Sequence, residues 1–565
     1  MPRNASRWLA VLVALTLAAC SGARGTGADA SAPPSAAEAS RFLAQTTYGP
    51  TDPTISQVRS SGYSQWIDQQ MVATPPTSHQ ADVEARLAAL RLNNPMATLN
   101  PVDFYYSYWK QAVTGPDQLR QRMKLALSEI FVVSLTDANV ETRGAASYYD
   151  MLGANAFGNF RTLLEQVTLH PMMGVYLTWL GNQKEDPVTG RNPDENYARE
   201  VMQLMTIGLF QLNPDGTVII DGLGRPIPSY TTDDIGGLAR VFTGYSYYSA
   251  NPTTVTFGGR NLPADARVRS MIPYPTFHST SAKSFLGVSI PASNVSNPNA
   301  DLKVALDTLF NHPNVGPFIG KQLIQRLVTS NPSPAYVGRV SAVFNNNGRG
   351  VRGDMSAVVR AILLDAEARN AAAAAGANFG KVREPLVRYA TWARAFGAAS
   401  ASGEWLIPST SANTSLGQSA LTAPSVFNFF RPGYSPPNTR VGSAGLVAPE
   451  FQIVDEITVA GYLNTMQTTI DVGAGVASGG VRDVRSAYAA EVALAGDVSA
   501  LTERVNLLLL NGTMSSALRG RIATAVGAVN VPSTGAQATI TTALTNRAKL
   551  AIYMTMASPE YLVLR

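Results

Sequence analysis

The sequence predicts a mainly α-helical protein, built as one large multi-helix domain with a small β-hairpin or irregular β insertion. The first observation is periodicity: in residues 301–328, apolar side chains recur at helical spacing of i, i+3, i+4, i+7 and i+8. The second is a turn–strand–turn pattern at about 212–230, where Asn213-Pro214-Asp215-Gly216 and Asp221-Gly222 flank a β-branched run. A further β-tending insertion is predicted at about 252–295.

Residues 40–565 are interpreted as one helical domain. The clearest prediction is a helix pair in 301–328, interrupted at Asn311-His312-Pro313-Asn314, because proline cannot continue a helix. Further helices are predicted, in chain order, over 119–133, 160–167, 358–368 and 382–396. Loops rich in Gly and Ser are predicted near 397–420 and 472–480.

The N-terminal residues have the composition of a bacterial lipoprotein signal. Two arginines precede an apolar run over residues 8–19, too short to span a bilayer, and Cys20, the only cysteine in the sequence, follows it. Residues 1–19 are therefore predicted to be a signal peptide, with Cys20 carrying a lipid anchor in the membrane. Residues 20–39 are predicted to be a flexible tether, and Ser21 favours the outer membrane of the cell envelope.

Composition and missing motifs argue against several classes of function, although an unfamiliar enzyme is not excluded. The 44 basic residues are scattered, and loss of residues 1–19 would lower the net charge from +5 to +3, so no nucleic-acid partner is predicted. The sequence lacks the motifs of common hydrolases, NTPases and dehydrogenases, and no cofactor is predicted. The four histidines are far apart, so no transition-metal site is predicted, although acidic residues between 186 and 234 leave calcium open.

The densest polar cluster is predicted to begin a helix near Pro193 and Asp194. One face of that helix would carry Asn196, Arg199, Glu200 and Gln203. The other faces are apolar, which predicts a buried helix whose polar stripe needs partners. In one interpretation the stripe is a binding or catalytic face, with Glu195 or Glu200 as acid, base or cation ligand and Arg199 holding an anion. In the other, which is preferred, it is an internal Arg–Glu network.

A second polar cluster begins another helix, which Thr231 or Thr232 can cap. Asp233 and Asp234 follow at the positive end of that helix, where capping explains at least one of them; alternatively they meet Arg199 or a divalent cation. His278 is the candidate for proton transfer, because histidine titrates near neutral pH. The alternative for His278 is a structural hydrogen-bonding role.

Several segments spread over nearly the whole mature chain form a recognisable set. They are Arg41-Phe42-Leu43 with Tyr48-Gly49-Pro50, residues 195–200, residues 230–244, Phe277-His278 with Lys283 and Gly287, residues 381–385, and Ser558-Pro559-Glu560-Tyr561. This set resembles the bacterial "domain of unknown function 1800" family. The resemblance implies a large secreted or lipid-anchored, mainly helical protein, with a secreted protein encoded nearby as a candidate partner. It implies no activity.

The chain departs from the family pattern at two places. Gln203 and Met205 stand where the family helix usually has Glu and later His, so any metal or proton chemistry of those positions would be lost here. The stretch 427–434, Phe-Asn-Phe-Phe-Arg-Pro-Gly-Tyr, matches a family loop only loosely. Its aromatic residues either line a sugar- or peptide-binding groove or belong to the core.

Two functions follow as hypotheses. The first is a cell-envelope lipoprotein that binds a partner protein or an envelope or extracellular polymer. The alternative is a hydrolase acting on a glycan or other polymer, with catalytic candidates Glu195, Glu200, Asp233, Asp234 and His278. Two carboxyl groups roughly 5–10 Å apart in an open cleft would favour the hydrolase. Carboxylates closed into pairs with arginine would favour the binding protein.

Overall fold

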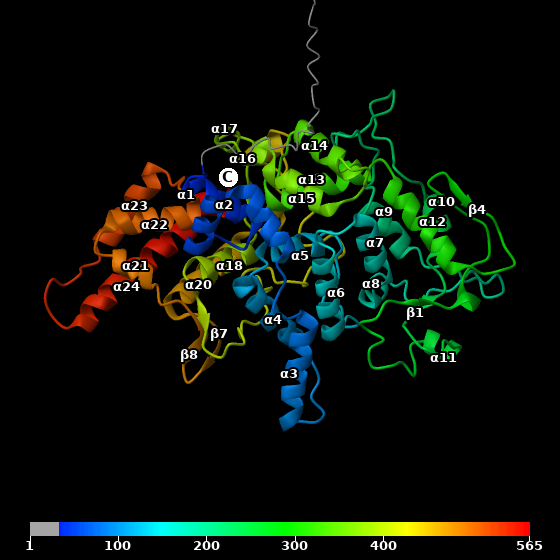
Figure 1. Cartoon of the computed structure of the whole chain (residues 1–565), viewed down its shortest axis with the longest axis horizontal. Coiled ribbons are helices and arrows are strands. Elements are labelled where there is room, and N and C mark those ends of the chain that lie inside the picture. Colours follow the sequence, from blue (N-terminus) through cyan, green and yellow to red (C-terminus); the bar gives the residue numbers. More distant parts are fainter. Residues whose placement is uncertain (1–32) are drawn as a thin grey trace, which may run out of the picture. The chain divides into compact units, whose positions relative to one another are not determined.

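α-Helices make up most of residues 33–565, the part of the chain that the computed structural model describes (Figure 1). The described residues contain 25 α-helices and nine short strands in small antiparallel sheets, so the predicted mainly α fold with small β insertions is confirmed. Residues 34–565 form one compact unit. The predicted signal peptide, the predicted lipidation site Cys20 and most of the predicted tether lie outside the described residues.

The first third of the described chain is entirely helical. Its helices are α1 (Ala36–Thr46), α2 (Asp52–Val72), α3 (His79–Asn93), α4 (Pro101–Thr114), α5 (Gln118–Ser128), α6 (Thr142–Ala154), α7 (Phe160–Leu169) and α8 (Pro171–Tyr176). Local sequence explains where helices begin: Ser35 and Glu38 form a capping box at α1, and His170 caps α8 before Pro171. The α3 helix projects from the body in Figure 1.

The middle of the chain combines helices with the predicted β insertions. Its elements are α9 (Asn196–Gln203), α10 (Thr232–Val241), β1 (Tyr245–Ser246), α11 (Thr254–Phe257), β2 (Ile272–Pro273), the 3₁₀ turn η1 (Pro275–Phe277), β3 (Lys283–Phe285), β4 (Val288–Ile290), α12 (Pro298–Asn311), α13 (Val315–Leu327), α14 (Pro334–Asn345), α15 (Met355–Leu364), α16 (Ala366–Arg369) and α17 (Ala371–Ala374). β1 pairs with β2, and β3 with β4. In the predicted 212–230 insertion, isolated bridges join Leu212 to Val218 and Ile220 to Pro226.

The last third ends beside the N-terminal helices. Its elements are β5 (Lys381–Val382), α18 (Pro385–Ala395), β6 (Ala399–Ser400), α19 (Arg440–Ser443), η2 (Pro449–Ile453), α20 (Glu456–Val472), β7 (Ala474–Ser478), β8 (Val481–Arg485), α21 (Ala489–Leu494), α22 (Val498–Leu510), α23 (Ser516–Gly527), α24 (Gln537–Met556), α25 (Pro559–Leu562) and β9 (Val563–Leu564). β9 pairs with β5, and α22 packs against α1 (Figure 1). The two ends of the described chain therefore meet.

The structure confirms one predicted element boundary and corrects others. The predicted break at residues 311–314 separates α12 from α13, as expected. The 382–396 segment is not helical from its start: β5 and Glu384 come first, because Pro385 occupies the first helical position of α18. The predicted loop near 472–480 contains β7, which pairs with β8 and closes a three-stranded sheet with β6.

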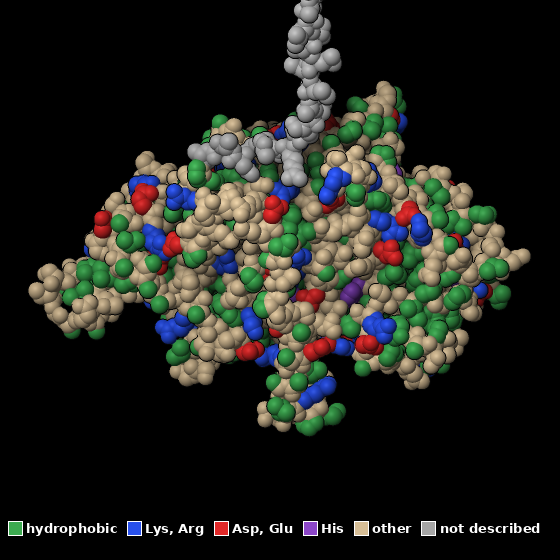
Figure 2. All heavy atoms as spheres, in the orientation of Figure 1, with side chains coloured by type: hydrophobic (Ala, Val, Ile, Leu, Met, Phe, Trp, Pro, Cys, Tyr) green, Lys and Arg blue, Asp and Glu red, His purple; other side chains and the backbone are tan. Residues whose placement is uncertain are grey.

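One continuous apolar core runs through residues 39–561, with Trp66, Trp109, Trp179 and Trp392 almost completely buried. On the face shown in Figure 2, basic and acidic side chains are interspersed. None of the helices described here has both the length and the apolar character needed to cross a bilayer. The core also encloses charged side chains, among them Glu129, Arg326 and Glu384.

Candidate functional site

The polar stripe predicted on the 193–203 helix divides into two parts. The helix, α9, begins at Asn196, later than predicted, with Glu195 as its N-cap residue. Arg199 Nη2 lies 3.2 Å from Glu195 Oε2, and the two side chains are 43% and 44% exposed. Glu200 is mostly buried, its Oε2 has no hydrogen-bond partner in residues 33–565, and burial raises its pKa although Arg199 opposes the rise. Arg199 thus pairs with Glu195 in a half-exposed, solvent-screened contact.

The residues at the two ends of the stripe, Asn196 and Gln203, form hydrogen bonds with other segments of the chain. The Tyr230 hydroxyl donates to Gln203 Oε1 at 3.2 Å, and Asn196 Nδ2 donates to Thr178 Oγ1 at 3.3 Å. Gln203 is the one member of the predicted site that also lines the pocket described below. The stripe is therefore not a single buried network but connects an exposed ion pair to a pocket wall.

The two acidic residues at the start of α10, Asp233 and Asp234, also differ in their surroundings: one is exposed and the other is hydrogen-bonded. Thr231 and Asp234 form a reciprocal capping box, and Asp234 Oδ1 also accepts from the Leu286 backbone N–H at 2.7 Å. Burial alone would raise the pKa of Asp234, but the backbone hydrogen bonds from Leu286 and Thr231 outweigh it and lower that pKa. Asp233 is exposed beside it. Capping and loop anchoring account for Asp234, as one of the two interpretations predicted.

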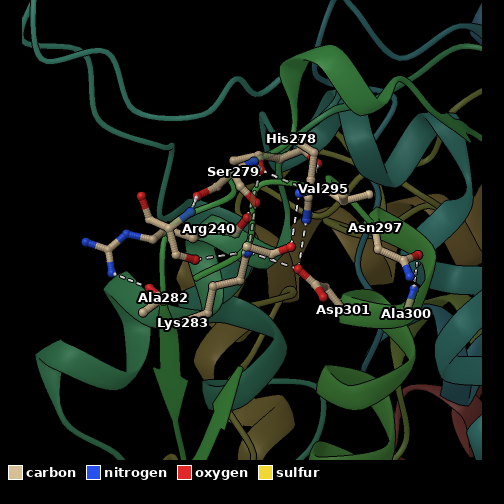
Figure 3. Close-up of polar contacts among 12 residues, drawn as sticks. Arg240, His278, Ser279, Ala282, Lys283, Val295, Asn297, Ala300 and Asp301 are labelled. Atoms are coloured by element: carbon tan, nitrogen blue, oxygen red, sulfur yellow. Dashed lines mark hydrogen bonds and ion pairs between the residues drawn. The ribbon is translucent and has the colours of Figure 1, made fainter. Parts of the chain in front are cut away.

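His278 is completely buried in a network that satisfies its ring (Figure 3). Nδ1 lies 2.8 Å from the Thr243 carbonyl oxygen, and Nε2 lies 3.0 Å from Asp301 Oδ2. Lys283 Nζ completes the network at 2.9 Å from the same Asp301 oxygen. Burial would raise the pKa of Asp301, but the hydrogen bonds from His278 and Lys283 outweigh it and lower that pKa. These contacts join the β3 region to α12, which agrees with the structural interpretation of His278.

The catalytic candidates do not gather around His278. Thr243, which contacts the imidazole, follows the C-terminal end of α10, whereas Asp233 and Asp234 lie in its first turn. At a rise of 1.5 Å per residue these positions are separated by roughly 14 Å along the helix. Gly244 explains the close approach at the C-terminal end: its φ is 72°, and a Cβ there would lie 2.6 Å from the His278 backbone nitrogen.

An aromatic pocket of about 360 Å³ lies where α9, α13 and the 426–432 loop meet. This cavity, called the aromatic pocket from here on, is lined by Glu129, Ile130, Gln203, Leu204, Gly208, Leu209, Phe318, Gln322, Arg326, Val426, Phe427, Phe430, Arg431 and Pro432. The Arg431 guanidinium lies 4.6 Å from the Phe427 ring centroid, which holds both side chains by a cation–π contact. Gln322 Nε2 is buried there with no hydrogen-bond partner in the described part of the chain. Size and lining suit a small-ligand site.

A buried ionic cluster adjoins the aromatic pocket through two of its members, Glu129 and Arg326, which line the pocket. It consists of Arg122, Glu129, Arg326, Lys381, Glu384 and Glu450, all at most 4% exposed. Arg326 Nε lies 3.2 Å from Glu129 Oε2, and Lys381 Nζ lies 3.0 Å from Glu450 Oε1. The Arg122 and Lys381 side chains also donate to the Arg326 carbonyl oxygen, each at 2.8 Å. Side chains from α5, α13, β5, α18 and η2 therefore converge on one enclosed point.

Two carboxyl groups of this cluster, those of Glu129 and Glu384, have pKa values shifted in opposite directions, which assigns one proton to the pair. Burial raises the pKa of Glu129 well above its ordinary value, and the charge of the neighbouring Glu384 raises it further. Burial opposes ionisation of Glu384 too, but the hydrogen bond from Glu129 and the charges of Lys381 and Arg122 lower its pKa to about 2. Gln418 Nε2 also donates to Glu384, at 2.7 Å. Glu129 is thus the neutral acid and Glu384 the carboxylate.

Sequence reasoning missed these acidic residues. Glu129 is the only charged residue between Lys124 and Asp137, so a lone acid inside an apolar run was the available signal. Lys381 and Glu384 appeared only within a segment that supported the resemblance. No group of three or more His, Cys, Asp or Glu side chains in residues 33–565 is arranged to hold a metal ion.

Comparison with known proteins identifies the family but no characterised relative. The family model described as "Protein of unknown function (DUF1800)" matches residues 41–563. No curated protein matches the chain, and no solved structure does. Because the match covers nearly all of the described residues, the chain belongs to the DUF1800 family of proteins of unknown function.

Proposed function

We propose that this protein is a lipid-anchored binding protein of the cell envelope, which holds a sugar unit of an envelope or extracellular polymer in the aromatic pocket. The observation that carries the proposal is the pairing of aromatic rings with amides in one cavity: Phe318, Phe427 and Phe430 line it together with Gln203 and Gln322. A sugar ring has an apolar C–H face that packs on an aromatic ring and hydroxyl groups that bond to amides. The unpartnered Gln322 Nε2 offers a donor for such a hydroxyl.

The alternative, a polymer hydrolase, is favoured by the raised pKa of Glu129, which lines the aromatic pocket. A neutral carboxylic acid is what protonation of a leaving group requires. Two observations favour binding instead. Glu195 is closed into a pair with Arg199, and Glu129 is buried beside Glu384, whose charge raises the pKa of Glu129 and holds its proton in place.

Binding is tested by affinity electrophoresis in gels that contain polysaccharide from the producing cell's envelope. Phe427→Ala should weaken retardation about tenfold, because an aromatic contact of this kind is worth about 1 kcal/mol or slightly more. Phe429→Ala is the matched control: it lies in the same loop and is also half-buried, but it does not line the aromatic pocket. Equal retardation of the Phe427→Ala and wild-type proteins would reject the pocket, and release of reducing ends would favour the hydrolase.

Membrane anchoring is tested at Cys20, which lies outside the described residues. Cys20→Ala is expected to leave unprocessed precursor or to release the protein from the membrane fraction, because no thiol remains to carry lipid. Fractionation and mass spectrometry of the N-terminus measure this. Unchanged membrane association together with an unchanged N-terminal mass would contradict the anchor.

A further inference from the structure

A second cavity, of about 740 Å³, lies among α1, α17, α25 and the chain following α22. It shares no lining residue with the aromatic pocket. Three arginines line it: Arg41 from α1, Arg383 between β5 and α18, and Arg565 after β9. Arg41, Arg383 and the lining residue Glu560 belong to three separate segments that carried the family resemblance, so the fold brings distant parts of that pattern to one cavity.

Two of these arginines are buried without a counter-ion. Arg41 is 7% exposed and Arg383 is 6% exposed. Within residues 33–565 neither forms an ion pair, since the carboxylate of Glu384 faces Arg122 and Lys381 instead. Arg383 Nη1 donates to the Leu509 carbonyl oxygen at 2.8 Å, but its Nε has no hydrogen-bond partner among the described residues. Burying a guanidinium without a counter-ion is costly, so an anionic ligand would be favoured at this cavity.

A third buried guanidinium, that of Arg369, adds positive charge beside Arg41. The Arg41 side chain donates to the backbone carbonyl of Arg369. Burial and the neighbouring charge of Arg41 together lower the pKa of Arg369 to about 10. Arg369 is held over the Phe42 and Tyr63 rings, at 5.0 and 5.4 Å from their centroids, rather than by a carboxylate.

The two acidic residues that line the cavity are engaged elsewhere. Glu38 Oε2 accepts from the Ser35 backbone N–H at 2.9 Å and from its hydroxyl at 2.8 Å. Glu560 accepts from the Ser515 backbone N–H at 2.9 Å and from its hydroxyl at 2.5 Å. Both carboxylates therefore serve helix starts: Glu38 acts on Arg41 only as a nearby charge without an ion-pair contact, and Arg383 lies 4.7 Å from the Tyr561 ring centroid rather than beside a carboxylate.

Much of the remaining wall is aliphatic. Ala37, Ala371 and Ala374 line the cavity beside Leu510 and Val563. We propose that this cavity binds an anionic amphiphile: a phosphate or carboxylate group pairs with Arg41 and Arg383, and an aliphatic chain packs against the alanine-rich wall. Guanidinium groups suit both anions because they donate two parallel hydrogen bonds. The inference concerns a site separate from the aromatic pocket and does not depend on sugar binding.

Titration calorimetry of the purified protein without its lipid anchor tests the proposal, using dodecyl phosphate, laurate, inorganic phosphate and dodecyl maltoside as probes. Dodecyl phosphate or laurate should bind, and neutral dodecyl maltoside should not. Arg41→Gln and Arg383→Gln should each weaken binding about tenfold or more, because each removes a charged hydrogen-bond donor. Arg440→Gln, an exposed arginine away from the cavity, should leave binding unchanged.

A cavity-filling variant provides a second test in case the arginine variants fail to fold. Ala374→Trp keeps every charge and should abolish binding, because the indole occupies the space of the aliphatic chain. Equal binding of dodecyl maltoside and dodecyl phosphate would overturn the anion site. Inorganic phosphate binding as tightly as dodecyl phosphate would overturn the amphiphile and leave a site for free anions. Unimpaired binding by Ala374→Trp would place the ligand elsewhere.

Discussion

Glu384→Gln is expected to lower the free energy of unfolding by about 3 kcal/mol or more, whereas Glu129→Gln should not lower it and should raise it at neutral pH, because the wild-type chain must take up a proton at Glu129 to fold. Glu384 is the ionised member of the pair and lies beside Arg122 and Lys381, at 3.8 and 4.0 Å. Its loss leaves buried Arg122 without a carboxylate, whereas Lys381 keeps Glu450 at 3.0 Å. Glu129 is already neutral, so an amide of the same shape replaces it with little change in charge. Urea denaturation at neutral pH measures both variants.

The double variant separates this account from a simple packing effect. In Glu384→Gln, Glu129 can release its proton and supply a carboxylate to Arg326, which limits the loss. The double variant Glu129→Gln/Glu384→Gln removes that compensation and should cost more than the sum of the two single changes. Additive effects, or a large cost for Glu129→Gln alone, would contradict the assignment of the proton to Glu129.

The pH dependence of unfolding should change in the same two variants, with opposite signs. The folded-state pKa of Glu384 is about 2, below its ordinary 4.5, so Glu384 stabilises the fold above pH 4.5. That stabilisation, about 3 kcal/mol, is lost as the pH falls from 4.5 to 2. The folded-state pKa of Glu129 is raised, so its contribution is complete below pH 4.5 and is lost as the pH rises through the folded value.

Urea denaturation of wild type and variants between pH 2 and pH 9 measures these contributions by difference. Subtracting the Glu384→Gln curve from the wild-type curve should give a stability difference that shrinks below pH 4.5. Subtracting the Glu129→Gln curve from the wild-type curve should give a stability difference that falls as the pH rises above 4.5. Parallel curves for both variants would show that the two carboxyl groups titrate normally, and the shared proton would be disproved.

Local patterns predicted much of the fold. The α12–α13 pair followed from apolar periodicity and a proline-containing break, because those signals act within a few residues. The β7–β8 hairpin did not, because its Gly- and Ser-rich sequence has weak strand propensity and is fixed by pairing with β6. The α9 start was misplaced because Pro193 and Asp194 carry helix-start chemistry but precede the helix.

The candidate site was less predictable because tertiary packing assembles it. Gln203 and the 427–432 loop were both singled out in the sequence, yet only the fold shows that they share a pocket. Glu129 and Glu384 are 255 positions apart, so no local pattern could place one proton between them. The polar residues that looked most reactive, Asp234 and His278, turned out to hold loops and helix ends through satisfied hydrogen bonds.

A crystal structure of the protein grown with oligosaccharides cut from the producing cell's envelope polysaccharide tests the proposed binding function most directly. The account predicts a sugar ring packed against Phe427, with its hydroxyl groups in hydrogen-bonding range of Gln203 and Gln322. An empty aromatic pocket at oligosaccharide concentrations that saturate the protein in solution, or a sugar bound instead over Glu195 and Asp233, would contradict it.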